Sequence, residues 1–317
     1  MKIINYTDMH CDTVTVCADR VADLRENGFQ LDLKRLSSSG CAAQCFAIFT
    51  KGETAPKDFE RYLAFYKRML LEHGDLILSV ENYGDLVAAQ KSNKVGAILT
   101  VENLGFIGTD LDRLNALEKN GVCMASLVWN YENALARPNL IFENDFPAFE
   151  KRVNTGLTDL GREAAERLDK LKIIIDISHL SDGGADELLN GRKIPLVASH
   201  SNAQGAYNVS RNLTDGQIKK IADCGGVVGV NFCFDFLGGS GGFESVYNHI
   251  SHIINVGGED VAALGSDFDG IPLSPQLEDC TRMQALFEYL SGRGLPFNTI
   301  EKLAYKNFFR VFKEIRG

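Results

Sequence analysis

The sequence predicts an α/β fold of the (β/α)8 TIM barrel class. Two observations point to this class: eight short, apolar, β-branched runs recur along the chain, and longer amphipathic segments separate them. Eight such repeats in roughly 265 residues match the length of a barrel domain. A doubly wound open sheet would produce a similar alternation and is the alternative fold.

The predicted strands are the segments in which apolar side chains follow one another without interruption, as in a sheet buried on both faces. In chain order they cover residues 3–7, 42–49, 95–101, 122–128, 172–178, 194–199, 225–232 and 261–266.

Two of the intervening segments have a clear helical pattern. In residues 57–73, apolar side chains such as Phe59 and Leu63 recur every three or four positions. Residues 158–171 begin with Thr158 and Asp159, which favour a helix N-terminus. No repeat, linker or shift of composition divides the chain, and we therefore expect residues 1–317 to form one domain.

Charge and cysteine content restrict the partners and the compartment. The 33 Lys and Arg residues against 42 Asp and Glu residues give a net charge of −9, which argues against nucleic acid or an anionic membrane as partner and favours a small molecule. The eight cysteines include no C-x-x-C pair, so we expect reduced thiols. Because the chain also has no apolar run typical of a signal peptide or a membrane span, we expect a cytoplasmic protein.

Ionisable residues follow five of the predicted strands, where a parallel barrel brings them into one ring at its C-terminal face. They are His10, Asp12, Glu102, His179, His200, Asp267 and Asp269. A lone histidine is usually structural, and for His249 and His252 we expect a solvated helix face. The coincidence of three histidines with carboxylates after the strands instead favours metal binding.

Imidazole and carboxylate together suit Zn²⁺ or a similar divalent ion. Five protein ligands exceed what a single tetrahedral zinc takes, and a carboxylate can bridge two ions. The pattern therefore predicts two metal ions per chain.

Several separated motifs, in order, resemble the membrane dipeptidase (renal dipeptidase) family of zinc peptidases, a branch of the amidohydrolase-like barrels. The resemblance covers almost the whole chain and lies in DMHCD (8–12), TVENLG (100–105), GLTDLGREAAERLDKLKIIIDISHLS (156–181), VASHSNA (197–203), SRNLTD (210–215), GSDFDG (265–270) and KLAYKNFFRVF (302–312).

The resemblance implies a binuclear zinc site and gives each residue a role. His10 and Asp12 would hold one ion and His179 and His200 the other, with Glu102 bridging them. Asp267 would lie beside the bridging water and the substrate's free amine. Arg211 would receive the terminal carboxylate of the substrate, a role that suits its planar guanidinium.

Two positions depart from the family pattern. Where family members carry a histidine that contacts the substrate carbonyl, this chain has Trp129, and a family tyrosine is replaced by Phe236. Trp129 would line the substrate pocket, while Asn130 or Tyr131 could donate a hydrogen bond to the carbonyl instead.

The sequence thus predicts a zinc-dependent dipeptidase that attacks the peptide bond with a metal-bridging hydroxide, with Asp267 and Glu102 as catalytic residues. A small peptide is the expected partner, and a homodimer is an option. The alternatives are another amidohydrolase on the same barrel, such as a cyclic amide hydrolase or a deaminase, or a non-catalytic metal-binding barrel.

Overall fold

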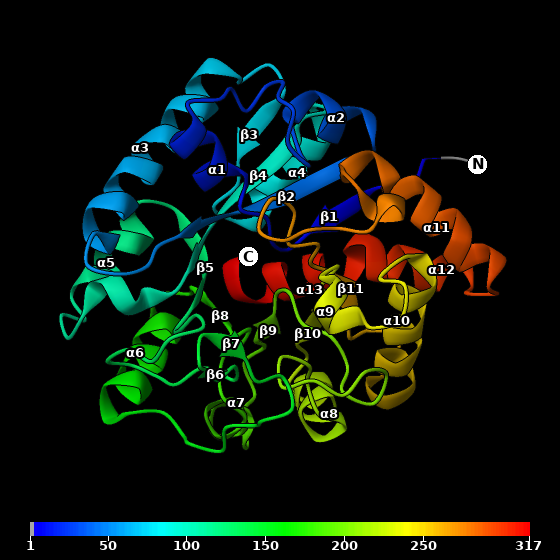
Figure 1. Cartoon of the computed structure of the whole chain (residues 1–317). Coiled ribbons are helices and arrows are strands. Elements are labelled where there is room, and N and C mark those ends of the chain that lie inside the picture. The colour runs from blue at the N-terminus through cyan, green and yellow to red at the C-terminus, as the bar shows by residue number, and fades with distance from the viewer. Residues whose placement is uncertain (1–2) are drawn as a thin grey trace.

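Eight buried segments form the parallel strands of a closed barrel, and helices surround it (Figure 1). The predicted (β/α)8 TIM barrel is confirmed. The computed structural model describes residues 3–317. The barrel strands are β1 (Tyr6–Asp8), β2 (Cys41–Phe49), β4 (Val95–Glu102), β5 (Val122–Ser126), β8 (Ile174–Asp176), β9 (Val197–Ala198), β10 (Val227–Val230) and β11 (Ala262–Leu264).

The barrel closes because β2 pairs with β1 on one side and with β4 on the other. From β2 the order runs through β1, β11, β10, β9, β8, β5 and β4, with parallel pairing throughout. The pairing of β2 with β4 extends from Ala43 opposite Gly96 to Phe49 opposite Glu102. This pairing excludes the open doubly wound sheet.

Each predicted strand overlaps one barrel strand, but several observed strands are shorter. The predicted segment 194–199 contains only β9, and the segment 172–178 contains only β8. Both shorten because Asp176, at the end of β8, accepts hydrogen bonds from the backbone N–H groups of Ser178 (2.9 Å) and Ser199 (2.8 Å). These donors are thereby withdrawn from the strand ladder.

Three short strands lie outside the predicted segments. β3 (Ile77–Ser79) pairs with the first half of β4, while β5 pairs with the second half of the same edge. β6 (Phe142–Glu143) and β7 (Phe146–Pro147) form an antiparallel hairpin between β5 and the next helix. Strands of two or three residues are too short to show a recognisable period in the sequence.

Helices connect successive strands and cover the outside of the barrel (Figure 1). Within residues 3–317 the α-helices are α1 (Thr13–Arg20), α2 (Leu33–Ser38), α3 (Ala55–Glu72), α4 (Tyr83–Lys91), α5 (Arg113–Lys119), α6 (Asp159–Lys170), α7 (Asp182–Leu189), α8 (Asp215–Asp223), α9 (Phe234–Leu237), α10 (Phe243–Gly257), α11 (Met283–Gly292), α12 (Phe297–Glu301) and α13 (Asn307–Arg316). Shorter helical turns cover Leu104–Ile107, Pro275–Leu277, Cys280–Arg282 and Lys302–Lys306.

The two helices predicted from periodicity are confirmed as α3 and α6. The N-terminus of α6 is capped as expected, because Thr158 Oγ1 accepts a hydrogen bond from the N–H of Gly161 (2.9 Å). In α3, Phe59 and Leu63 are buried against the barrel.

The C-terminal helix α13 closes the end of the barrel at which the strands begin (Figure 1). Phe308 and Phe312 of α13 are fully buried in one apolar cluster with Ala43 of β2 and Val227 of β10. The opposite end, where the strands finish, is therefore the end left for polar residues. Elements that take part in the barrel run from β1 to α13, which supports our proposal of one domain; residues 1 and 2 lie outside the described part.

None of the helices in residues 3–317 combines the length and the apolar character needed to cross a membrane.

Candidate metal centre

The five predicted metal ligands meet at the C-terminal end of the barrel, although they come from four different strands. His10 and Asp12 follow β1, Glu102 is the last residue of β4, and His179 and His200 follow β8 and β9. Each of these side chains is buried, with at most 8% of the residue exposed. A cluster of ionisable groups in such an environment needs opposite charges or a bound ion to be stable.

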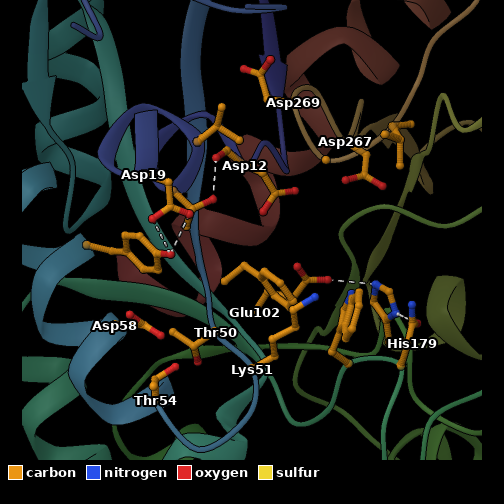
Figure 2. A pocket seen from close by; sticks show the side chains of 18 of the residues that line it. Asp12, Asp19, Thr50, Lys51, Thr54, Asp58, Glu102, His179, Asp267 and Asp269 are labelled. Carbon is orange, nitrogen blue, oxygen red and sulfur yellow. Dashed lines mark hydrogen bonds and ion pairs between the residues drawn. The ribbon is translucent and has the colours of Figure 1, made fainter. Parts of the chain in front are cut away.

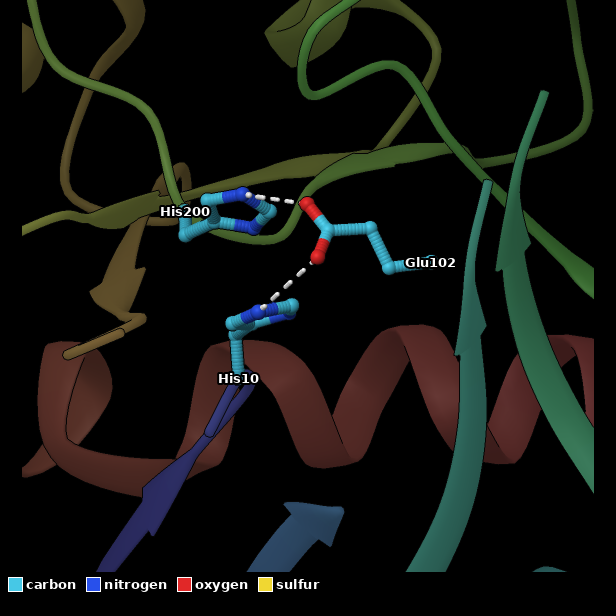
Figure 3. A group of neighbouring side chains, drawn as sticks. All are labelled: His10, Glu102 and His200. Carbon is cyan, nitrogen blue, oxygen red and sulfur yellow. Dashed lines mark ion pairs between the residues drawn. The ribbon is translucent and has the colours of Figure 1, made fainter. Parts of the chain in front are cut away.

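Glu102 lies at the centre of this cluster, and its two oxygens face different partners (Figure 3). Oε1 is 2.9 Å from His179 Nε2 and 3.4 Å from His200 Nε2. Oε2 is 3.8 Å from His10 Nε2 on the other side. The carboxylate therefore faces His10 with one oxygen and the other two histidines with the other, while the rings of His10 and His200 also lie close together, with centres 3.9 Å apart.

His10 also faces two further carboxylates. Its Nε2 is 3.5 Å from Asp12 Oδ2 and 3.7 Å from Asp267 Oδ1. The donor atoms of His10, Asp12 and Asp267 lie within 4.8 Å of one another, as do those of His10, Glu102 and His200. Among the described residues, His10 Nε2 and Asp12 Oδ1 are buried without a hydrogen-bond partner. Buried polar atoms are rarely left unpaired, and here they converge on a space suited to a cation.

Hydrogen bonds on the far side of two rings orient their Nε2 atoms, which lie 2.9 Å from each other. His179 Nδ1–H donates to Asn130 Oδ1 (2.7 Å). His200 Nδ1 lies 2.7 Å from Ser199 Oγ, which donates in turn to Asp176. With the proton on Nδ1, each ring presents an unprotonated Nε2, the form in which imidazole binds metals.

Burial and mutual charge shift the pKa of the clustered groups. Burial by itself lowers the pKa of His10, but Asp12, Glu102 and Asp267 outweigh it and raise that pKa to about 10. Burial raises the pKa of Asp267 to about 6, although His10 acts in the opposite direction. Burial also raises the pKa of Glu102 well above its usual value. The carboxylates thus need a positive charge among them, which a divalent ion would supply.

The backbone around the ligands adopts an unusual conformation. His179, Asp267 and Asp269 all have positive φ angles, of 69°, 66° and 67°. Such left-handed residues are uncommon outside glycine, and they concentrate at functional sites. The neighbouring Gly270 is required for space, because a Cβ there would lie 2.3 Å from Asp12 Oδ2.

A cavity of about 590 Å³ opens beside the cluster (Figure 2). Trp129 and Asn130, which we predict to contact the substrate, line it together with Lys51. Asn130 binds His179 through its amide oxygen. Tyr131 lies mostly outside, with 59% of the residue exposed, and stacks on Phe142 of β6 (ring centres 5.4 Å apart).

Arg211 forms part of the same cavity wall and is 99% buried. Its guanidinium lies over the ring of Phe236, 5.1 Å from the ring centre, and Nη2 is 3.1 Å from His179 Nε2. The Nε and Nη1 atoms have no hydrogen-bond partner within residues 3–317. Arg211 therefore retains N–H groups at Nε and Nη1 that could donate to a carboxylate.

The expectation for His249 was wrong, since this residue is buried rather than solvated. Its Nδ1 accepts from the N–H of Ala203 and its Nε2–H donates to the carbonyl of Leu237, each at 3.1 Å. His252 is partly exposed and pairs with Asp215 (2.7 Å). Both histidines thus have structural partners away from the metal centre.

The model of the membrane dipeptidase family, peptidase family M19, matches residues 1–317. The chain belongs to the membrane dipeptidase family. As the family membership shows, it is a metal-dependent dipeptidase, an enzyme that hydrolyses peptide bonds.

Relatives and solved structures agree with this membership. An uncharacterized protein of Klebsiella pneumoniae is 31% identical over 259 residues, covering 80% of this chain and 94% of that protein. An uncharacterized dipeptidase of Schizosaccharomyces pombe is 31% identical over 252 residues, covering 78% and 60% of the two chains. The crystal structure of a family M19 metallopeptidase, dipeptidase AC, covers all of both chains with 27% identity and a TM-score of 0.91.

A metallopeptidase from Rhodobacter sphaeroides, solved with a phosphinate mimic of the dipeptide L-Ala-D-Ala, has 26% identity and a TM-score of 0.89. It covers 99% of this chain and 100% of its own. An amidohydrolase from Pseudomonas aeruginosa, at 19% identity and a TM-score of 0.81, shares the fold.

Several residues around this dipeptidase site escaped sequence reasoning. Asn231, at the end of β10, donates a hydrogen bond to Asp267 Oδ2 (2.9 Å), and Asp176 orients Ser199 beside His200. Both interrupt apolar strand segments, in VGVNF and in KIIIDIS, and that interruption was the available signal. Lys51 gave no signal, because an exposed lysine in a loop is ordinary.

Proposed function

We propose that this chain hydrolyses small dipeptides with two zinc ions held around Glu102. The observation that carries the proposal is the orientation of this carboxylate. Its Oε1 faces His200 while Oε2 faces His10 (Figure 3), and His179 also lies on the Oε1 side. His10 and Asp12 would hold one ion, His179 and His200 the other, and Glu102 would bridge them.

The residues fit such ions by their chemistry and by their burial. The donor set consists of imidazole nitrogens and carboxylate oxygens, the ligands that zinc takes in catalytic sites. The unpaired His10 Nε2 and Asp12 Oδ1 lie within this set. Bound divalent ions would polarise the substrate carbonyl and lower the pKa of the water that attacks it.

We assign the proton transfer to Asp267. Asn231 holds Oδ2 of this carboxylate, while Oδ1 faces His10 and the cavity. From that position Oδ1 would accept the proton of the attacking water and deliver it to the departing amine. The same carboxylate would pair with the free amino group of the substrate.

Arg211 would bind the terminal carboxylate of the substrate. Its two unpartnered donors are fixed in a buried guanidinium, so that the carboxylate would dock at a defined distance from Glu102. Charge partners for both ends of the substrate would favour dipeptides over longer peptides. The dipeptide mimic bound by the Rhodobacter sphaeroides metallopeptidase supports a substrate of this size.

Two further parts of the proposal concern the setting of the enzyme. All eight cysteines are free and buried, which supports a reducing, cytoplasmic compartment. Light scattering of the zinc-loaded protein would distinguish a monomer from a homodimer.

The experiment is turnover of a dipeptide library by protein that has been stripped with a chelator and reloaded with zinc. We expect two zinc ions per chain by mass spectrometry of the metal, and hydrolysis of dipeptides but not of the matching tripeptides. A zinc content that stays at one or below after reloading would exclude the two-ion site. Hydrolysis of cyclic amides in place of dipeptides would favour the alternative amidohydrolase.

A further inference from the structure

We infer that Lys51 is a further catalytic residue, which contacts the carbonyl oxygen of the bond that is cleaved. The inference rests on the proposed function. Lys51 follows the last residue of β2 by two positions, in the loop that leads to α3. Its side chain lines the same cavity as Glu102 and Arg211, and Figure 2 shows it reaching from the cavity wall toward Glu102.

Lys51 brings a positive charge that no carboxylate of the described residues neutralises by an ion pair. The other acidic groups near the cavity mouth are already engaged: Asp19 accepts hydrogen bonds from Arg61 (2.6 Å) and Tyr62 (3.0 Å), and Asp58 is 3.4 Å from Arg61. Lys51 is exposed in the free protein. A bound dipeptide would cover it, and removal of water would strengthen its electrostatic effect.

An aromatic wall holds the ammonium in position without neutralising it. Lys51 Nζ lies 5.4 Å from the ring centre of Trp129, within the range of an attractive cation–π contact. Trp129 is itself fixed between Phe49 (4.7 Å between ring centres) and Tyr131 (5.6 Å). Phe49 ends β2 two residues before Lys51, so the strand that leads into the lysine's loop also supports Trp129.

The chemistry of the reaction leaves a role for such a cation. The carbonyl oxygen gains negative charge as the peptide bond is attacked, and a cation beside it stabilises the transition state more than the substrate. Trp129 carries no charge, and Asn130, whose amide oxygen accepts from His179, could offer the carbonyl only a neutral N–H donor. Arg211 is the other cation in the cavity lining, and it is assigned to the terminal carboxylate.

A different role for Lys51 would be to bind a side-chain carboxylate of an acidic dipeptide. The direction of the side chain argues for the carbonyl, because Lys51 points toward Glu102 in the interior of the cavity (Figure 2). The two roles differ in kinetics. A contact to the reacting oxygen changes kcat for every dipeptide, whereas a contact to a side chain changes KM for acidic dipeptides alone.

The test compares Lys51→Met, which removes the charge and keeps the length, with Lys51→Arg, which keeps the charge. Lys57→Met on the exposed side of α3 is the matched control. With zinc-loaded protein and two substrates, alanyl-alanine and alanyl-glutamate, we expect Lys51→Met to lower kcat by about 10²–10³-fold for both, with little change in KM. Lys51→Arg should retain more of the activity, and Lys57→Met all of it. Zinc content and Tm should not change in any variant.

A second measurement uses a phosphinate dipeptide mimic, whose anionic oxygen occupies the position of the reacting carbonyl. Lys51→Met should weaken its inhibition by a factor similar to the loss of kcat. An unchanged kcat in Lys51→Met, or a loss confined to KM for alanyl-glutamate, would overturn the inference while leaving the dipeptidase proposal intact. If the native zinc-loaded protein hydrolyses no dipeptide, the proposed function fails and the role of Lys51 fails with it.

Discussion

The two oxygens of Glu102 face opposite halves of the proposed centre, and the first prediction follows from this geometry. Replacing Glu102 by alanine removes a ligand from both ions, whereas replacing His10 removes a ligand from one. We expect Glu102→Ala to retain less than one zinc per chain and His10→Ala to retain about one, as measured by metal analysis after dialysis. Equal losses in the two variants would show that Glu102 does not bridge.

The carboxylate of Asp267 is held by Asn231 and faces the cavity with its other oxygen. The substitution Asp267→Asn preserves the shape of the side chain but abolishes its capacity to take a proton. We expect kcat to fall by about 10²–10⁴-fold while zinc content and Tm stay near those of the native protein. Steady-state kinetics on the zinc-loaded variant measure this, and near-normal turnover would remove Asp267 from the proton transfer.

Arg211 can be tested with a pair of substrates. A dipeptide and its C-terminal amide differ in the carboxylate that Arg211 would bind through its guanidinium, in which Nε and Nη1 are unpartnered. We expect the native enzyme to favour the dipeptide in kcat/KM by about 1.5–3 kcal/mol, the range of a charge-assisted hydrogen bond, and Arg211→Ala to lose most of that preference. If the native enzyme hydrolyses both equally well, Arg211 does not receive the carboxylate.

Single residues differ in how far the sequence reveals them. His10, Glu102 and His200 could be found because an ionisable residue after an apolar strand stands out. The partner of His179 could not be identified in the same way. Asn130, predicted to contact substrate, lines the cavity and also accepts from the ring of His179 through its amide oxygen. A hydrogen bond between the ends of β5 and β8 depends on the exact placement of both, which no local pattern specifies.

On the scale of elements, the helix α10 shows how an amphipathic pattern can be misread. His249 and His252 are three residues apart, which suggested one exposed face. His249 instead belongs to the stripe of Val246, Ile250 and Ile253, whose side chains are all buried. The spacing of these apolar residues was visible in the sequence and gave the correct side of the helix.

The burial of His249 has a consequence for stability. Burial lowers the pKa of His249 to about 4, outweighing the hydrogen bond to the carbonyl of Leu237. The unfolded chain, with a histidine pKa of about 6.5, therefore binds a proton more tightly than the folded chain does. The free energy of unfolding therefore decreases as the pH falls from 6.5 toward 4, by about 3 kcal/mol for this one group.

Urea unfolding at several pH values tests this prediction. His249→Gln is the informative variant, because an amide can accept from Ala203 and donate to Leu237 without titrating. Between pH 7 and pH 4 the free energy of unfolding should fall by about 3 kcal/mol less in the variant than in the native protein. Parallel pH curves for the two proteins would show that His249 is not buried in its neutral form.

On the scale of the whole molecule, the alternation of strands and helices could be predicted, whereas the closure of the barrel could not be read directly. Closure depends on β2 pairing with β4 as well as with β1, a contact that leaves no trace in the periodicity of either segment. The position of α13 across the starting end of the strands is likewise a long-range contact. Barrel closure and the position of α13 together give the barrel one apolar end and one polar end. Every proposed metal ligand lies at the polar end.

The affinity of the protein for zinc should depend on pH because His10 must lose a proton to bind the ion. Three buried carboxylates surround this ring and raise its pKa to about 10, so that with no ion bound His10 carries a proton at pH 7. His10 must release that proton to bind zinc. The affinity for zinc should therefore rise with pH up to about 10. A histidine with the ordinary pKa near 6.5 is already unprotonated above pH 7, so the affinity for zinc would no longer rise there.

We expect the affinity of the chelator-stripped protein for zinc to rise at least tenfold per pH unit between pH 7 and pH 9, in competition titrations against a metal buffer of known pH dependence. Nitrogen-15 NMR of the metal-free protein provides the direct measurement: one histidine, assigned by its absence in His10→Asn, should remain an imidazolium at pH 8. His249 should already be neutral at pH 6, since its pKa is about 4, and it serves as the internal reference. A His10 signal that titrates near 6.5, together with a flat zinc affinity above pH 7, would mean that the carboxylates of Asp12, Glu102 and Asp267 do not converge on this ring in the metal-free protein.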